Sequence, residues 1–152
     1  MLSAPLSKAL ASVPGFIPPA WWPPVSNPTV EITSVADAFP DVSLAGNYLF
    51  LFTFFVVGLV FNIIGEGLYY HGLLLPKMRG VFGRWDWVAN GIGFSLKHLY
   101  QRWIYPSVFA PALGMALLAG PIGSLPLSML FHWVGNFLFA FLGMTPAVFG
   151  AG

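Results

Sequence analysis

The 152-residue sequence contains no cysteine and little charge. Without cysteine it can form neither a disulfide framework nor a thiolate metal site. Charged residues make up 7% of the chain, whereas a soluble domain carries roughly 25%. The net charge of +1 lacks the basic excess typical of nucleic-acid-binding proteins, so we expect no nucleic-acid partner. Because 57% of the residues are hydrophobic, we predict an integral membrane protein with the lipid bilayer as its solvent.

The first 43 residues differ in composition from the rest of the chain. They hold eight of the fourteen prolines, and proline blocks the continuation of a helix. No unbroken apolar run follows Lys8, so this segment does not resemble a signal peptide. We therefore predict a Pro-rich, mostly non-helical leader over residues 1–43 and a transmembrane helical domain over residues 44–152.

The second part predicts an all-α fold, a polytopic transmembrane bundle of about four spanning or part-spanning helices. One span needs about 20 apolar residues. Residues 44–75 are uncharged apart from Glu66, which indicates one long tilted helix or two pieces joined near Gly65-Glu66-Gly67. We predict the further helices over residues 85–103, 104–119 and 124–143. The basic loop 77–84 places the adjoining helix ends on the cytoplasmic side by the positive-inside rule.

Four polar side chains fall near the middle of the predicted spans. Counted from the cytoplasmic helix ends, Glu66, His98, His132 and Asn136 lie about 12–18 Å deep in a hydrocarbon core about 30 Å thick. His132 and Asn136 are spaced i, i+4 and share one helix face. An ionisable group costs several kcal/mol in a membrane and usually faces a polar interior. We therefore expect these four side chains to meet.

Such a set has the parts of a peptide hydrolase. A carboxylate beside an imidazole can activate water as a general base. A second imidazole and an amide N–H can stabilise an oxyanion. Glu66, His98 and His132 are also the ligand types of a zinc hydrolase site, so metal-free and zinc-dependent hydrolysis both remain open. Alternatively, each polar group only forms a hydrogen bond between helices.

Three short motifs occur in order on the predicted helices. They read GEGLYYHGLLLP over 65–76, FSLKHL over 94–99 and HWVGN over 132–136. Together they resemble the CAAX protease and bacteriocin-processing family of intramembrane proteases, also called CPBP or Abi. The pattern of that family is Glu-Glu-x-x-x-Arg, then Phe-x-x-x-His, then His-x-x-x-Asn. The resemblance covers roughly residues 45–143.

The resemblance implies an intramembrane endopeptidase that cleaves a membrane-anchored peptide or protein, either prenylated or leader-bearing. It implies that Glu66 and His98 activate water, and that His132 and Asn136 hold the oxyanion. The family has been described both as glutamate-dependent and as metal-dependent. If a metal such as zinc is present, its ligands are expected to be Glu66, His98 and His132. The resemblance also implies a multi-pass protein of the bacterial plasma membrane.

Two departures from the family pattern keep other hypotheses open. Gly67 replaces the second glutamate and His71 replaces the arginine. Losing both partners leaves no orphan charge, but the surroundings of Glu66 have changed. One alternative is therefore a catalytically inactive relative that acts as a membrane binding or scaffold protein. Another is a small transporter or channel subunit with a continuous aqueous path. We expect His71 to be an interface or structural residue and Lys97 to snorkel toward the nearer surface.

Overall fold

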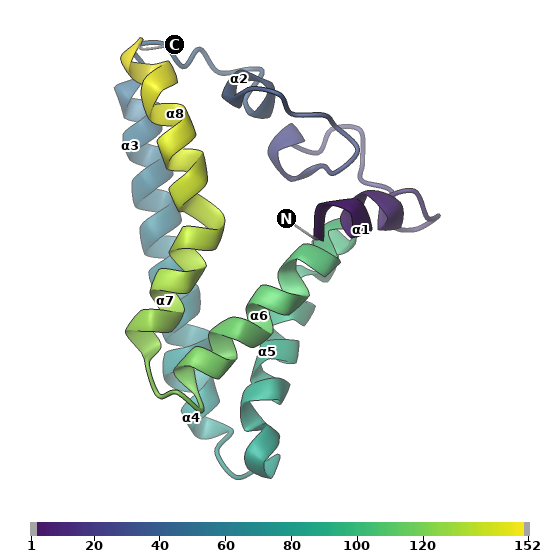
Figure 1. The fold of residues 1–152 in the computed structure, drawn as a ribbon, viewed down its shortest axis with the longest axis vertical. Coiled ribbons are helices and arrows are strands. Elements are labelled where there is room, and N and C mark those ends of the chain that lie inside the picture. Colours follow the sequence, from purple (N-terminus) through teal and green to yellow (C-terminus); the bar gives the residue numbers. More distant parts are fainter. Residues whose placement is uncertain (1–2, 151–152) are drawn as a thin grey trace.

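The computed structural model describes residues 3–150, and every regular element in that range is helical. The predicted all-α class is confirmed for these residues. The main helices are α3 (Tyr48–Val57), α5 (Asp86–Leu96), α6 (Tyr105–Ala119), α7 (Leu125–Trp133) and α8 (Phe139–Phe149). They form two arms, which meet at one end of the molecule and diverge toward the other (Figure 1). One arm contains α3, α7 and α8, and the other contains α5 and α6.

The longest helix runs without interruption over Tyr48–Lys77. It begins with α3, where the Asn47 side chain accepts a hydrogen bond from the backbone N–H of Phe50 at 3.1 Å and so caps the helix. Two π-helical stretches follow, Gly58–Gly65 and Gly67–Leu74, and the helix ends in the short α4 (Leu75–Lys77). The predicted apolar region 44–75 therefore contains one long helix, which begins at Tyr48, rather than two pieces.

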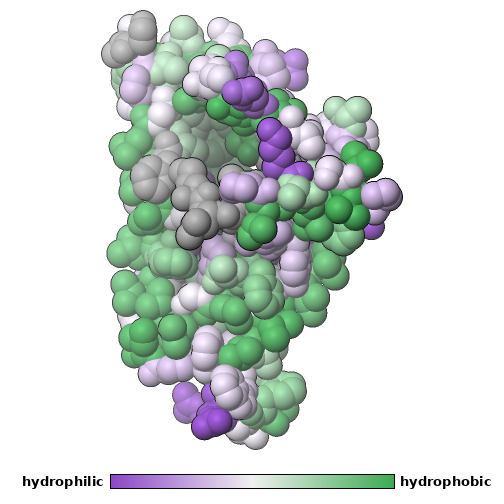
Figure 2. Space-filling view, turned by 45° about the vertical axis from the view of Figure 1, so that its right-hand side comes forward, coloured by the Kyte–Doolittle hydropathy of each residue, from purple (hydrophilic) through white to green (hydrophobic). Residues whose placement is uncertain are grey.

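This helix is the clearest membrane span among the described residues. It has 30 residues, and its most apolar 18-residue window has a mean hydropathy of 2.3, with only 17% of that window buried within the protein. The segments Leu125–Leu138 and Ala140–Phe149 qualify as a second span if the pair, bent by 43°, is counted as one. The structure thus provides one or two span candidates and does not establish the predicted four. Hydrophobic residues cover the middle of the visible face, with hydrophilic residues toward its ends (Figure 2).

In the arm of α5 and α6, the first helix is shorter than predicted. The expected helix over 85–103 changes at Leu96 into a 3-10 helix, Lys97–Ile104, and Gln101 within it has a non-helical φ of −118° and ψ of 50°. The α5 helix has only 11 residues, which at 1.5 Å per residue is about 16 Å. It therefore crosses about half of the hydrocarbon core.

The leader is anchored to the second arm rather than lying apart from it. It contains α1 (Ser3–Leu10), a 3-10 turn Pro24–Ser26 and α2 (Val35–Ala38). The Trp103 indole donates a hydrogen bond to the Ser26 carbonyl at 3.1 Å, and the rings of Trp22 and Trp103 meet edge to face with centroids 5.0 Å apart. The division into a leader and a membrane domain at residue 43 stays a prediction.

A glycine sets the spacing between the long helix and the segment that joins α7 to α8. A Cβ on Gly58 would lie 2.6 Å from Cδ1 of Phe137, closer than two carbon atoms can approach. We expect Gly58→Ala to lower the free energy of unfolding by about 1–3 kcal/mol through overpacking. Thermal unfolding in detergent micelles measures this loss. Gly93→Ala is the control, because a Cβ on Gly93 meets nothing within 4 Å. Equal stability of both variants would contradict the close packing at Gly58.

Candidate active site

The first candidate residue, Glu66, sits at the junction of the two π-helical stretches of the long helix. Such irregular helical turns frequently mark functional sites. Gly67 follows it and allows a close approach to α7, because a Cβ there would lie 2.8 Å from Cγ of Met129. This close contact brings the carboxylate of Glu66 toward α7, which carries His132.

The two oxygens of the Glu66 carboxylate have different surroundings. Oε1 forms an ion pair with the Lys97 ammonium and accepts a long hydrogen bond, 3.5 Å, from Nδ2 of Asn62. Oε2 is buried and accepts no hydrogen bond in the structure. It lies 4.0 Å from Nε2 of His132. One oxygen is therefore held in place, and the other is an available acceptor beside an imidazole.

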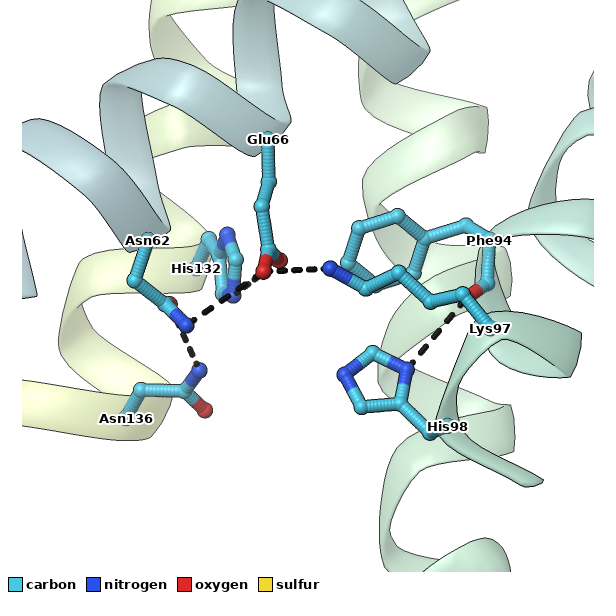
Figure 3. Close-up of polar contacts among 7 residues, drawn as sticks. All are labelled: Asn62, Glu66, Phe94, Lys97, His98, His132 and Asn136. Carbon is cyan, nitrogen blue, oxygen red and sulfur yellow. Dashed lines mark hydrogen bonds and ion pairs between the residues drawn. The ribbon is translucent and has the colours of Figure 1, made fainter. Parts of the chain in front are cut away.

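A short polar chain connects Glu66 to the third motif. Nδ2 of Asn136 donates a hydrogen bond of 3.3 Å to Oδ1 of Asn62. Nδ2 of Asn62 in turn donates to Oε1 of Glu66. His132 is 6% exposed and lies one helical turn before Asn136. Figure 3 shows these side chains turned toward one another from the long helix, from α7 and from the π-helical stretch Val134–Leu138 that follows α7.

His98 approaches the same region from the second arm (Figure 3). Its Nδ1 lies 3.3 Å from the carbonyl oxygen of Phe94. A carbonyl can only accept, so Nδ1 carries the hydrogen and Nε2 is left with a lone pair in the neutral ring. His98 has no hydrogen bond or ion pair with the other three candidates, but it lines one cavity of about 230 Å³ together with His132 and Asn136.

The structure thus joins Glu66, His132 and Asn136 in one cluster and places His98 across a cavity from two of them. Two members of the cluster, Asn62 and Lys97, were not predicted from the sequence. Asn62 precedes Glu66 by four residues on the same helix, a spacing that predicts a shared face. Lys97 was expected to snorkel to the surface, and this expectation was wrong.

Packing explains the direction that Lys97 takes. Its ammonium lies over the rings of Phe94, at 4.7 Å, and Tyr70, at 5.4 Å. These two faces attract a cation and guide it inward to Glu66. The carboxylate that the sequence leaves without a partner therefore receives a positive charge from the neighbouring arm.

His71 forms a buried contact between helices. It is 4% exposed, and its Nδ1 lies 2.9 Å from Oδ1 of Asn90 on α5. Nδ2 of Asn90 donates to the carbonyl of Tyr70 at 2.9 Å. The residue in place of the family's arginine therefore joins the long helix to α5 and forms no ion pair with Glu66.

The zinc hypothesis for Glu66, His98 and His132 does not fit this arrangement. Within residues 3–150, no three His, Asp or Glu side chains are grouped closely enough to hold a metal ion. The ammonium of Lys97 already pairs with Oε1 of the carboxylate that a metal ion would need.

A comparison with known protein families shows to which family the chain belongs. A family model described as "Type II CAAX prenyl endopeptidase Rce1-like" matches residues 48–138, more than half of the chain. The chain belongs to the Rce1-like family. This membership confirms the resemblance seen in the three motifs, and the matched range includes all four candidate residues as well as Asn62 and Lys97.

The Rce1-like family is a family of integral membrane proteases, which agrees with the apolar surface and the long helix. A protease of this family has a membrane-associated peptide or protein as its substrate. No curated protein and no solved structure was found to match the chain.

Proposed function

We propose that this chain is an intramembrane endopeptidase that hydrolyses a peptide bond of a membrane-anchored substrate, either prenylated or leader-bearing. One observation carries the proposal. A carboxylate oxygen of Glu66 is buried, accepts no hydrogen bond and lies 4.0 Å from a buried imidazole, in a chain of a protease family. We place the protein in the bacterial plasma membrane as a multi-pass protein, with the basic loop 77–84 on the cytoplasmic side.

The proposed reaction begins with the activation of water. Oε2 of Glu66 accepts a proton from a water molecule, and the oxygen of that water attacks the carbonyl carbon of the scissile bond. Nε2 of His98 offers a second acceptor from across the cavity, because its Nδ1 hydrogen is bonded to Phe94. The C–N bond of the tetrahedral intermediate then breaks, and the proton passes to the leaving nitrogen. A positioned general base of this kind contributes about 10²–10⁴-fold to the rate.

Donors for the oxyanion come from α7 and from the π-helical stretch Val134–Leu138 after it. Nε2 of His132 faces an acceptor, Oε2 of Glu66, and this favours a hydrogen on that nitrogen. The Asn136 amide uses one N–H for Asn62 and has a second one available. Two donors close to the attacked carbonyl stabilise the developing negative charge.

An apolar cavity beside Glu66 supports the membrane-anchored class of substrate. The cavity has a volume of about 480 Å³, and its lining includes Phe50, Phe54, Val57, Phe61 and Phe137. Asn62 and Glu66 form its polar end. A hydrocarbon chain in this cavity would pack against these aromatic rings and would bring the attached peptide to the carboxylate.

The experiment that tests this proposal uses His98. We expect His98→Ala to lower the cleavage of a prenylated peptide in proteoliposomes by about 10²-fold or more, because one of the two proton acceptors is lost. Mass spectrometry of the products measures the rate. Leu99→Ala is the matched control, an exposed neighbour on the same 3-10 helix, and should keep the wild-type rate. Unchanged cleavage by the His98 variant would reject its role.

A further inference from the structure

A polar cavity that Glu66 does not line lies among the elements at the end of the molecule where the two arms meet. Figure 1 shows that end of the fold. The cavity has a volume of about 330 Å³. Its walls come from the end of the long helix, the following loop, the start of α5 and the turn between α6 and α7. His71, Arg79, Arg84 and Asp86 provide its charged and ionisable lining, with Trp87 beside them.

The deepest of these groups is a buried nitrogen without a partner. His71 is 4% exposed, and its Nε2 forms no hydrogen bond. The ring is fixed because Nδ1 bonds to Oδ1 of Asn90. Since Nδ2 of Asn90 is directed to the Tyr70 carbonyl, Oδ1 is the acceptor and Nδ1 carries the hydrogen. In the neutral ring Nε2 then keeps a lone pair without a donor, on a side chain that lines the cavity. This lone pair requires a donor such as a hydroxyl group.

Two guanidinium groups line the same cavity without a carboxylate partner. In the part of the chain that the structure describes, neither Arg79 nor Arg84 forms an ion pair. The one acid nearby, Asp86, accepts hydrogen bonds from the backbone N–H groups of Gly80, at 2.6 Å, and Phe82, at 2.8 Å. The loop therefore offers an excess of positive charge at a point where the apolar span Tyr48–Lys77 ends.

We propose that this cavity binds the headgroup of an anionic phospholipid that carries hydroxyl groups, of which phosphatidylglycerol is the simplest example. The phosphodiester lies against Arg79 and Arg84, because guanidinium groups match phosphate oxygens in geometry and charge. A headgroup hydroxyl donates to Nε2 of His71. The site is at the membrane surface, where basic residues close to a span attract anionic lipids. The proposal does not depend on the reaction at Glu66.

The experiment compares two lipids that differ only in the hydroxyl groups. Full-length protein in detergent is mixed with equal amounts of phosphatidylglycerol and phosphatidylpropanol, which have the same acyl chains, the same charge and the same three-carbon headgroup skeleton. Native mass spectrometry counts the bound lipids. We expect about fivefold more phosphatidylglycerol, which corresponds to one hydrogen bond of about 1 kcal/mol. Equal binding of both lipids by the wild-type protein would overturn the role of His71.

Variants test the two parts of the site separately. Arg79→Gln with Arg84→Gln should weaken binding of both lipids about tenfold or more, since each charge-assisted hydrogen bond is stronger than a neutral one. The control, Lys77→Gln with Arg102→Gln, removes the same charge outside the cavity and should keep the binding. If the control loses as much, the attraction is a diffuse surface effect and the site is refuted.

The lipid must also be distinguished from a soluble phosphodiester. The deacylated headgroup, glycerophosphoglycerol, contains the same phosphate and hydroxyl groups without acyl chains. We expect it to compete only at concentrations at least a hundredfold higher than the lipid, because acyl chains on the adjoining apolar surface add to the binding. Competition at equal concentration would assign the site to a soluble metabolite. His71→Phe should remove the preference for phosphatidylglycerol, and the wild-type lipid comparison decides if that variant fails to fold.

Discussion

Glutamine in place of Glu66 is expected to abolish peptide cleavage while the protein stays folded. The amide has the shape of the carboxylate and retains contacts to Asn62, but it cannot take a proton from water. The loss of a general base predicts a fall in kcat of about 10²–10⁴-fold. The rate of product formation in proteoliposomes measures this fall, with circular dichroism as the test of folding.

Glu31→Gln is the matched control for that experiment. It makes the same chemical change at an exposed residue of the leader, far in sequence from the three motifs. We expect the control to cleave at the wild-type rate. If Glu66→Gln also cleaved at the wild-type rate, Glu66 would have no part in the reaction, and the cluster around it would be purely structural.

The second large effect concerns Lys97, whose ammonium pairs with Glu66. Lys97→Met removes the cation and leaves the carboxylate without a charged partner at membrane depth. Removing one partner of a buried ion pair costs about 3–5 kcal/mol. The two side chains here are 24% and 20% exposed, so we expect a smaller loss, about 1–3 kcal/mol of unfolding free energy. Thermal unfolding in micelles measures it, with Lys77→Met as the exposed control.

A double substitution separates the ion pair from the packing of the lysine chain. In Glu66→Gln with Lys97→Met, no charge is left unpaired, so most of the stability lost in Lys97→Met should return. Cleavage should not return, because the base is missing. A double variant as unstable as Lys97→Met would show that the lysine stabilises the protein through its contacts with Phe94 and Tyr70 alone.

The sequence was sufficient to predict the membrane class and the joining of Glu66 with His132 and Asn136. Both depend on a local property that the surroundings do not alter. The apolar composition requires lipid, and a count along a helix gives the depth of a residue within a bilayer. The i, i+4 spacing of His132 and Asn136 puts both on one face whatever packs against it.

The direction of Lys97 could not be predicted in this way. A lysine chain is long enough to reach either the surface or the interior, and the sequence does not say which. The outcome depends on the rings of Phe94 and Tyr70, which come from different helices and meet only when the arms pack. The same reasoning applies to Asn90, whose contact with His71 joins two helices that lie side by side only in the folded chain.

The number of spans was also beyond the reach of composition alone. Hydropathy identifies apolar stretches but not where a helix changes its form. The transition at Leu96 and the bend between Leu138 and Ala140 shorten two of the expected helices. The non-helical backbone of Gln101 then interrupts the 3-10 helix that follows α5. We have no account of either change from the local sequence.

We expect Glu66 to act as a general base even though Gly67 and His71 replace its usual neighbours. The most direct measurement incubates the purified wild-type chain in proteoliposomes with a prenylated C-terminal peptide and determines the product masses. If Glu66 activates water, we expect cleavage at one peptide bond, with a single oxygen from labelled water in the new carboxyl group. An intact peptide, under conditions in which another protease of the family cuts it, would contradict the account and favour an inactive membrane-binding relative.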